Sequence, residues 1–126
     1  MLKIYIAAGL DHAEYVEELG MKIEKLGHSV INSWHLTHKN QTEVSGAYQD
    51  LAEIDRANCC IFLTFSKSTQ GGRYIEQGYA LAIKRNGEDM RLIICGPRES
   101  CFDHLPDFEQ YTEVELLNVL KPKAEV

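Results

Sequence analysis

Long apolar runs are missing from this 126-residue sequence. A membrane-spanning helix needs about 20 consecutive apolar residues, and no stretch approaches that length. The opening MLKIYIAA contains a lysine and is soon followed by Asp11, which is not the pattern of a signal peptide. Linker-like segments, internal repeats and low-complexity tracts are missing as well. We therefore expect one domain over residues 1–126, in a cytoplasmic protein without a membrane segment.

Positive charge is scarce. The chain has 13 lysines and arginines against 19 aspartates and glutamates, which gives a formal net charge of -6 and a pI near 5.3. Proteins that bind nucleic acid without sequence preference need a basic surface to replace the counterions of the phosphates. We therefore expect no nucleic-acid polymer as a partner, although a small ligand could still use single arginines.

Cysteines are few, and most of them lie inside apolar runs: Cys59, Cys60, Cys95 and Cys101. This placement favours reduced core residues over a disulfide framework. Adjacent residues of a strand point to opposite faces, so Cys59 and Cys60 cannot bind one ion together. His35 and His38 have a spacing that a metal could use, but no nearby cysteine or carboxylate completes the set. We expect neither a metal nor another cofactor.

Short apolar runs alternate with segments of helical periodicity. Strands are expected at residues 2–8, 28–32, 59–65, 91–95 and 108–111. Helices are expected to begin near Asp11, Val44, Arg73 and Thr112. Asp11 and Glu14 have the spacing of a capping box at the first of these helices. The alternation predicts an α/β fold: a flavodoxin-like, doubly wound, three-layer sandwich with a five-stranded parallel sheet in the order 2-1-3-4-5.

Unusual residues concentrate in the loops that such a fold places at the carboxyl ends of its strands, where ligands bind. These loops are residues 8–11, 33–44, 66–72 and 96–105. Glu76 follows the third loop and is expected in the first turn of its helix. There the helix dipole favours an ionised carboxylate, which is an available nucleophile. Acidic residues also occur in first turns for stability alone, so this position does not decide its role.

The second helix carries two aspartates beside its apolar stripe of Tyr48, Leu51 and Ile54. At 100° per residue, Asp55 is expected near the buried direction and Asp50 on its flank, closer to the pocket. A carboxylate near a core is usually held by a backbone amide or a basic neighbour, which favours a structural role for Asp55. For Asp50, function and simple solvation stay equally open.

Trp34 is the only tryptophan and lies in a predicted strand-end loop, where it could stack on a nucleobase or anchor the loop.

The sequence does not support membership of several other protein classes with a related fold. A response-regulator receiver needs an aspartate where this chain has Thr64, Phe65 and Ser66. A flavodoxin needs a hydroxyl-rich first loop, and a P-loop needs a lysine and a hydroxyl that STQGGRYIE does not supply.

Two motifs are more specific: YQDLAEIDRANCCIFLTF at residues 48–65 and GGRYIEQGYALA at residues 71–82. Together with the opening KIYIAA, they resemble the nucleoside 2-deoxyribosyltransferase family, which includes the 2'-deoxynucleoside 5'-phosphate N-hydrolases. The resemblance extends from Lys3 to about Leu120. It implies cleavage of the N-glycosidic bond of a 2'-deoxynucleoside or its 5'-monophosphate, with transfer of the sugar to another base or to water.

The resemblance also implies roles for individual residues. Glu76 matches the nucleophile that holds the deoxyribosyl group as an ester, and Asp50 matches the acid that assists departure of the base. The residues expected to bind substrate are Gly9, Trp34, Gln70, Gly71, Gly72, Arg73 and Arg98. No cofactor is implied, and the family resemblance predicts a homodimer or a larger even oligomer.

One departure keeps the substrate open. Six residues before the glutamate, family members carry an acidic residue for a sugar hydroxyl or a serine for a 5'-phosphate, whereas this chain has Gln70. Arg73 and Arg98 could bind a phosphate or pair with Asp50 or Asp55. Two other hypotheses remain: a non-catalytic nucleotide-binding or sensing module, and a relative that acts on another ribosyl compound such as a dinucleotide.

Overall fold

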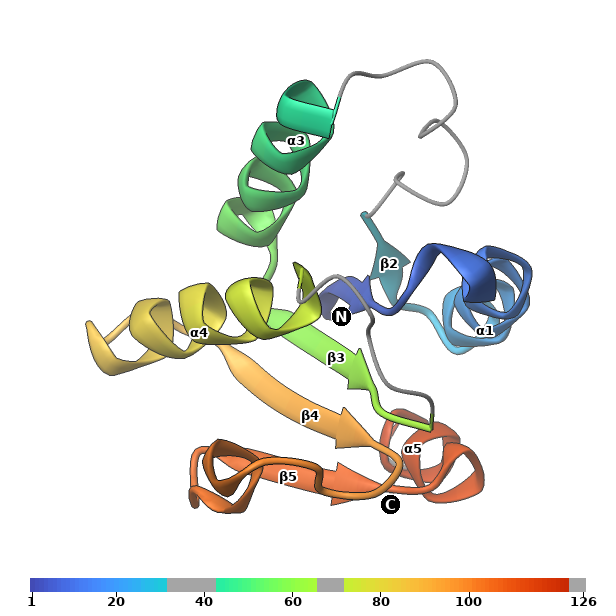
Figure 1. Cartoon of the computed structure of the whole chain (residues 1–126). Coiled ribbons are helices and arrows are strands. Elements are labelled where there is room, and N and C mark those ends of the chain that lie inside the picture. Colours follow the sequence, from blue (N-terminus) through green and yellow to red (C-terminus); the bar gives the residue numbers. More distant parts are fainter. Residues whose placement is uncertain (32–42, 66–71, 123–126) are drawn as a thin grey trace.

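A single parallel sheet organises the molecule. The computed structural model describes residues 1–31, 43–65 and 72–122. The sheet has the order β2-β1-β3-β4-β5, which confirms the predicted flavodoxin-like topology (Figure 1). Its strands are β1 (Lys3–Ala7), β2 (Ser29–Val30), β3 (Cys59–Leu63), β4 (Arg91–Cys95) and β5 (Phe108–Tyr111).

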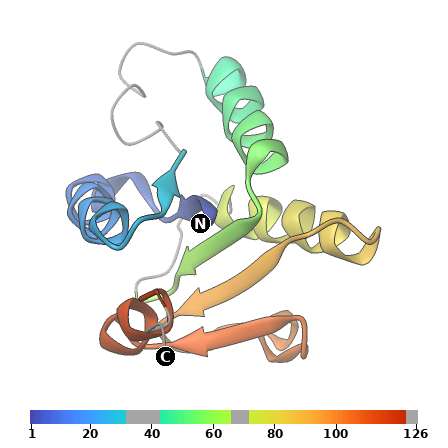
Figure 2. The same cartoon turned by 180° about the vertical axis from the view of Figure 1, so that it is seen from behind.

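Helices cover both faces of the sheet. Helices α1 (Ala13–Lys25) and α5 (Glu113–Val119) lie on one face, and α3 (Glu43–Arg56) and α4 (Gly72–Arg85) lie on the other (Figures 1 and 2). Two short 3₁₀ helices, η1 (Leu10–His12) and η3 (Cys101–His104), lie in connections. Within the described ranges, no helix combines the length and apolar character that crossing a bilayer requires.

The central strand β3 is buried along its whole length, because β1 and β4 flank it and helices cover both faces. Tyr5 of β1 is in register with Cys60 of β3. Side chains alternate along a strand, so Tyr5 points toward the α4 face while Ile4 and Ile6 point to the opposite one. All four cysteines are free. As predicted, Cys59, Cys60 and Cys95 are core residues, whereas Cys101 is exposed in η3.

The start of α1 differs from the prediction. Residues 10–12 form a 3₁₀ turn, closed by the His12 amide donating to the Gly9 carbonyl at 3.0 Å. Asp11 therefore lies inside this turn, and the N-cap is His12, whose side chain makes no capping bond. The predicted capping box was wrong. A capping box does occur at α5, where the Thr112 hydroxyl accepts from the Glu115 amide at 3.2 Å.

The carboxyl ends of the central strands are joined by side-chain and backbone contacts. The Thr64 hydroxyl donates to the Pro97 carbonyl at 2.5 Å, and the Gly96 amide donates to the Tyr111 carbonyl at 3.0 Å. Gly96 has a φ of 123°, and a Cβ added there would lie 2.6 Å from the Thr64 hydroxyl oxygen. Only glycine fits this turn without strain, because both the backbone angle and the space exclude a side chain.

We expect Gly96→Ala to lower the free energy of unfolding by roughly 3 kcal/mol, through backbone strain and overpacking together. Urea denaturation measures this loss. Gly87→Ala is the matched control, because Gly87 also has a positive φ of 89° but a Cβ there meets nothing within 4 Å. It should lose only about 1 to 2 kcal/mol. Equal losses would show that the contact with Thr64 is unimportant.

Candidate functional site

A buried tyrosine joins the first strand to the α4 glutamate. The Tyr5 side chain is fully buried, and its hydroxyl lies 3.1 Å from both carboxyl oxygens of Glu76. The two residues are 71 positions apart in the sequence. A phenol that donates to a carboxyl group stabilises the charged form of that group, so this bond favours ionisation of Glu76.

Helix α3 adds two further acidic side chains, Asp50 and Glu53. Glu53 is 1% exposed and Asp50 is partly buried. Burial raises the pKa of Tyr5 well above its ordinary value, and the charges of Glu76, Asp50 and Glu53 raise it further. The Tyr5 hydroxyl of β1 thus bonds the Glu76 carboxyl group of α4, and the charges of Asp50 and Glu53 of α3 act on the same phenol.

Burial controls the protonation of this cluster. It raises the pKa of Glu76 to about 8, with help from the Asp50 charge and, more weakly, from Glu53. The hydrogen bond from Tyr5 and the charge of Arg73 act in the opposite direction. Burial and the Glu53 charge raise the pKa of Asp50 to about 6. The Glu76 carboxyl group therefore holds its proton to a higher pH than the Asp50 carboxyl group does.

The position of Glu76 within its helix differs from the prediction. Helix α4 begins at Gly72, so Glu76 falls after the first turn, which contains no acidic residue. The effect of the helix dipole declines beyond that turn. The predicted first-turn position of Glu76 was therefore wrong, and burial, the largest influence on its pKa, raises that pKa instead of favouring the charged form.

The buried face of α3 also differs from the prediction. Tyr48 is 73% exposed, and Asp55 is exposed and accepts a 2.6 Å hydrogen bond from the Tyr79 hydroxyl. The buried direction is defined by Glu53 and Ile54 instead. Sequence reasoning missed Glu53, although it lies three residues after Asp50 and so shares a helix face with it.

Arg73 is buried beside this cluster, with a side chain only 1% exposed. Its partner is Glu99, whose carboxyl oxygen lies 3.2 Å from the Arg73 Nη2, rather than Asp50 or Asp55. Within the part of the chain that the structure describes, the Arg73 Nε and Nη1 have no hydrogen-bond partner. Buried donors normally find partners, so these two N–H groups are available to donate hydrogen bonds to an anionic or carbonyl oxygen of a ligand.

The other predicted binding residues are spread out or undescribed. Arg98 is exposed and uses its Nε to bind the Asp103 carbonyl at 3.0 Å, and its Nη1 to bind Gln110. Gly9 closes the turn before α1, and Gly72 is the first residue of α4. Several positions fall outside the described residues: Trp34, Gln70, Gly71, His35 and His38.

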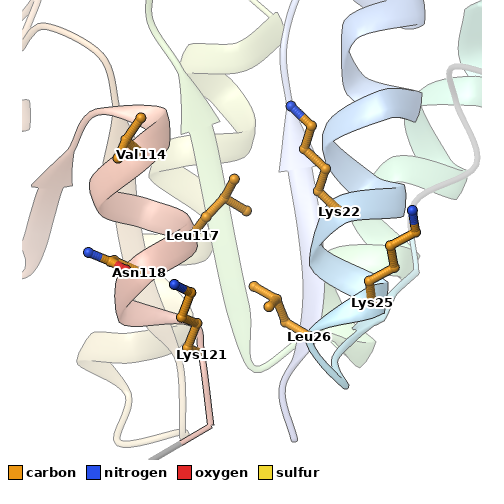
Figure 3. Close-up of a pocket in the computed structure, with 7 residues that line it drawn as sticks. All are labelled: Lys22, Lys25, Leu26, Val114, Leu117, Asn118 and Lys121. Carbon is orange, nitrogen blue, oxygen red and sulfur yellow. The ribbon is translucent and has the colours of Figure 1, made fainter.

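A surface groove of about 430 Å³ lies on the opposite face of the sheet, between α1 and α5 (Figure 3). Its lining residues are Lys22, Lys25, Leu26, Val114, Leu117, Asn118 and Lys121. Lys22 is 3.7 Å from a carboxyl oxygen of Glu113. None of these lining residues is acidic.

Comparisons with known proteins return no match to a family model, a curated protein or a solved structure. The family resemblance therefore remains a likeness of motifs. The hydrogen bond between Tyr5 and Glu76 is independent of that likeness, and so is the effect of the Asp50 charge on the pKa of Glu76. Glu76 and Asp50 are the two residues that the motifs single out.

The raised pKa values predict that the folded protein loses stability as the pH rises. Folding favours the protonated Glu76 carboxyl, so this contribution is complete below its ordinary pKa of 4.5 and is lost as the pH rises toward about 8. We expect the free energy of unfolding in urea to fall between about pH 5 and pH 8. Glu76→Gln, which stays neutral, should remove most of that slope.

Glu88→Gln serves as the control, because Glu88 is exposed in the turn after α4. It should keep the wild-type dependence on pH. A Glu76→Gln protein with the wild-type slope would contradict the assignment of the buried proton to Glu76.

Proposed function

We propose that the chain cleaves the N-glycosidic bond of a 2'-deoxynucleoside or its 5'-monophosphate. The deoxyribosyl group passes through an ester on Glu76 to water or to a second base. The observation that supports this most is the hydrogen bond between the Tyr5 hydroxyl and Glu76, together with the Asp50 charge that acts on both residues. Retaining glycosidases use such a pair, in which one carboxyl group acts as nucleophile and the other as acid and base.

The number of protons on the pair fits this chemistry. With pKa values of about 8 for Glu76 and about 6 for Asp50, the pair holds one proton at neutral pH. Strongly interacting groups titrate as a pair, so one proton can be placed on either carboxyl group. Transfer of that proton from Glu76 to Asp50 leaves one carboxylate to attack and one acid to protonate the base.

The bonds and protons then balance over two steps. Glu76 forms a bond from a carboxylate oxygen to C1' while the bond from C1' to the base nitrogen breaks, and Asp50 gives its proton to the base. In the second step, water attacks C1' and loses a proton to Asp50, which restores Glu76 and releases the sugar. A second base with an N–H group can replace water in the same way, and transfer is the result.

Tyr5 and Arg73 support the nucleophile. The Tyr5 hydroxyl reaches both Glu76 oxygens, and both this bond and the Arg73 charge lower the pKa of Glu76 and favour its carboxylate form. We propose that the unpartnered Arg73 N–H groups bind an oxygen of the substrate. In this proposal the other residues that bind substrate are Gly72 at the helix start and Gly9, Trp34, Gln70, Gly71 and Arg98.

A second candidate function is a nucleotide-binding or sensing module without turnover. One feature favours it: burial raises the pKa of Glu76, and the protonated form of a carboxyl group is not a nucleophile. This candidate requires ligand binding without product. Measuring the release of free base therefore distinguishes the two functions.

We further propose that two copies pair through α3 and α4, in the cytoplasm. These helices expose apolar side chains near the site: Val44 at 66%, Tyr48 at 73% and Ile75 at 70%. Exposed apolar side chains grouped on one face are typical of an interface. The free cysteines fit a reducing compartment.

Free base should be released from at least one 2'-deoxynucleoside or 5'-monophosphate, as measured by chromatography with and without a second base. Glu76→Gln should abolish release, because the ester cannot form. Asp50→Asn should slow it by about 10²- to 10⁴-fold, the usual contribution of an acid and base catalyst. A ribonucleoside and a dinucleotide are included in the same assay, to test whether the protein acts on another ribosyl compound.

The same assay should show a maximum of activity between about pH 6 and pH 8, where the pair holds one proton. Asp55→Asn is the matched control, since this aspartate on α3 is exposed and accepts a hydrogen bond from the Tyr79 hydroxyl. It should keep activity within about twofold. Ligand-induced thermal stabilisation without release of base from any substrate would favour the binding module instead.

Light scattering should give twice the mass of one chain, which is 14.3 kDa. The double variant Tyr48→Ser/Ile75→Ser should shift the protein toward the single-chain mass, because it removes the two most exposed apolar side chains of the pairing face. Val114→Ser, on the opposite face, should leave the mass unchanged. A wild-type protein that stays at the single-chain mass would overturn the pairing.

A further inference from the structure

A second polar cluster is buried between α4 and the β4–β5 loop, residues 96–107. It consists of Arg73 and Gln77 from α4 and Glu99 and Asp103 from the loop. Arg73, Gln77 and Asp103 are each no more than 5% exposed. The chemistry proposed above does not use Gln77, Glu99 or Asp103. Buried polar groups are costly, so their presence beside Glu76 requires a physical reason.

Asp103 is the centre of this cluster. It is fully buried, and its Oδ1 accepts from the Gln77 Nε2 at 2.6 Å and from the Ser100 hydroxyl at 3.3 Å. Its Oδ2 accepts from the backbone amides of Glu99 at 2.8 Å and Ser100 at 3.4 Å. Burial alone would oppose ionisation of Asp103, but the bonds from Gln77, Glu99 and Ser100 and the Arg73 charge together lower its pKa. The ionised Asp103 carboxylate therefore accepts hydrogen bonds both from its own loop and from Gln77.

Glu99 provides a parallel link to the same helix segment. Its carboxyl oxygens accept from the Arg73 Nη2 at 3.2 Å and from the Tyr74 hydroxyl at 3.3 Å. The loop thus contacts the residues before Glu76 through Glu99 and the residue after it through Asp103. Successive residues of a helix point about 100° apart, so Gln77 can face the loop while Glu76 faces Tyr5.

We propose that Asp103 is a positioning residue for Glu76. By holding the Gln77 amide, it fixes the rotation of α4 about its axis, and with it the direction in which the Glu76 carboxyl group points. The effect on turnover rests on the proposed function above, whereas the effect on the orientation of Glu76 does not.

The geometry at Glu76 shows why rotation matters. One Tyr5 hydroxyl lies 3.1 Å from both carboxyl oxygens, and hydrogen bonds weaken steeply beyond about 3.5 Å. A small rotation of the helix would lengthen at least one of these contacts. The far end of α4 is attached differently, by an exposed Arg85 whose Nη2 lies 2.9 Å from an Asp107 oxygen. That pair also joins α4 to the segment before β5, but it lies away from Glu76.

Gln77→Met and Asp103→Asn test the proposal, with Asp107→Asn as the matched control. Gln77→Met keeps the shape and buried volume of the side chain but removes the amide. Two quantities are measured in each protein: the pH midpoint of the Glu76 carboxyl carbon by ¹³C NMR, and kcat and KM for base release. The Glu76 signal is assigned by its absence from Glu76→Gln.

We expect both test variants to move the Glu76 midpoint by about half a pH unit or more, because its surroundings change. Among the described residues, the titratable groups that interact with Glu76 are Tyr5 from β1, Cys60 from β3, Asp50 and Glu53 from α3, and Arg73 from its own helix. We also expect kcat to fall on the order of 10²-fold with KM within about threefold, as for a misplaced catalytic group. Asp107→Asn should change neither quantity.

A lower melting temperature with an unchanged Glu76 midpoint and unchanged kcat, in a folded Gln77→Met protein, would overturn the proposal. So would a midpoint that moves equally in Asp107→Asn, since any attachment of α4 would then suffice. If Asp103→Asn does not fold, the measurements on Gln77→Met alone test the proposal. The NMR midpoint of Glu76 is measured without substrate. A wild-type protein that releases no base would overturn the proposed function, but the midpoint would still test whether Asp103 positions Glu76.

Discussion

The burial of acidic side chains beneath α3 and α4 is the constraint on which the rest of the structure depends. Taking carboxyl groups out of water costs free energy unless protons, hydrogen bonds or opposite charges compensate. Here a proton on Glu76, the Tyr5 hydroxyl and the Arg73 charge share that compensation. Each of them fixes a position in the fold, because a compensating group works only at short range.

The parallel sheet supplies the rigid part of this arrangement. Tyr5 is anchored in β1, whose neighbours β2 and β3 hold it on both sides. The carboxyl groups come from two helices that pack on one face of the sheet. The β4–β5 loop then fixes the near end of α4 through Asp103. The site therefore has a rigid strand on one side and an adjustable helix, held by polar contacts, on the other.

The fold and half of the site could be predicted from the sequence. Alternating apolar runs and helical periodicity are local signals, and they predicted the strands, the layers and the strand order. The motifs identified Glu76 and Asp50. The role of Tyr5 could have been suspected, because a tyrosine in a buried strand needs a partner for its hydroxyl. The Gln77–Asp103 contact joins residues 26 positions apart, and no local pattern encodes such a pairing.

The errors have a common physical origin. Asp55 was placed near the core because Leu51 and Ile54 were taken to define the buried direction, whereas Glu53 and Ile54 are the buried residues of this helix. Glu76 was expected to be charged because helix starts favour anions, but burial dominates. Both errors arose because the sequence does not show which acidic side chains the fold removes from water.

The separation of Tyr5 and Glu76 along the chain has a consequence for biosynthesis. The ribosome makes β1 before α4, and the tyrosine of β1 cannot meet the glutamate until 71 further residues have been added. Contacts between distant positions form late because the intervening chain must first be ordered. The nascent protein thus has no assembled acidic cluster until α4 has left the ribosome and docked on the sheet.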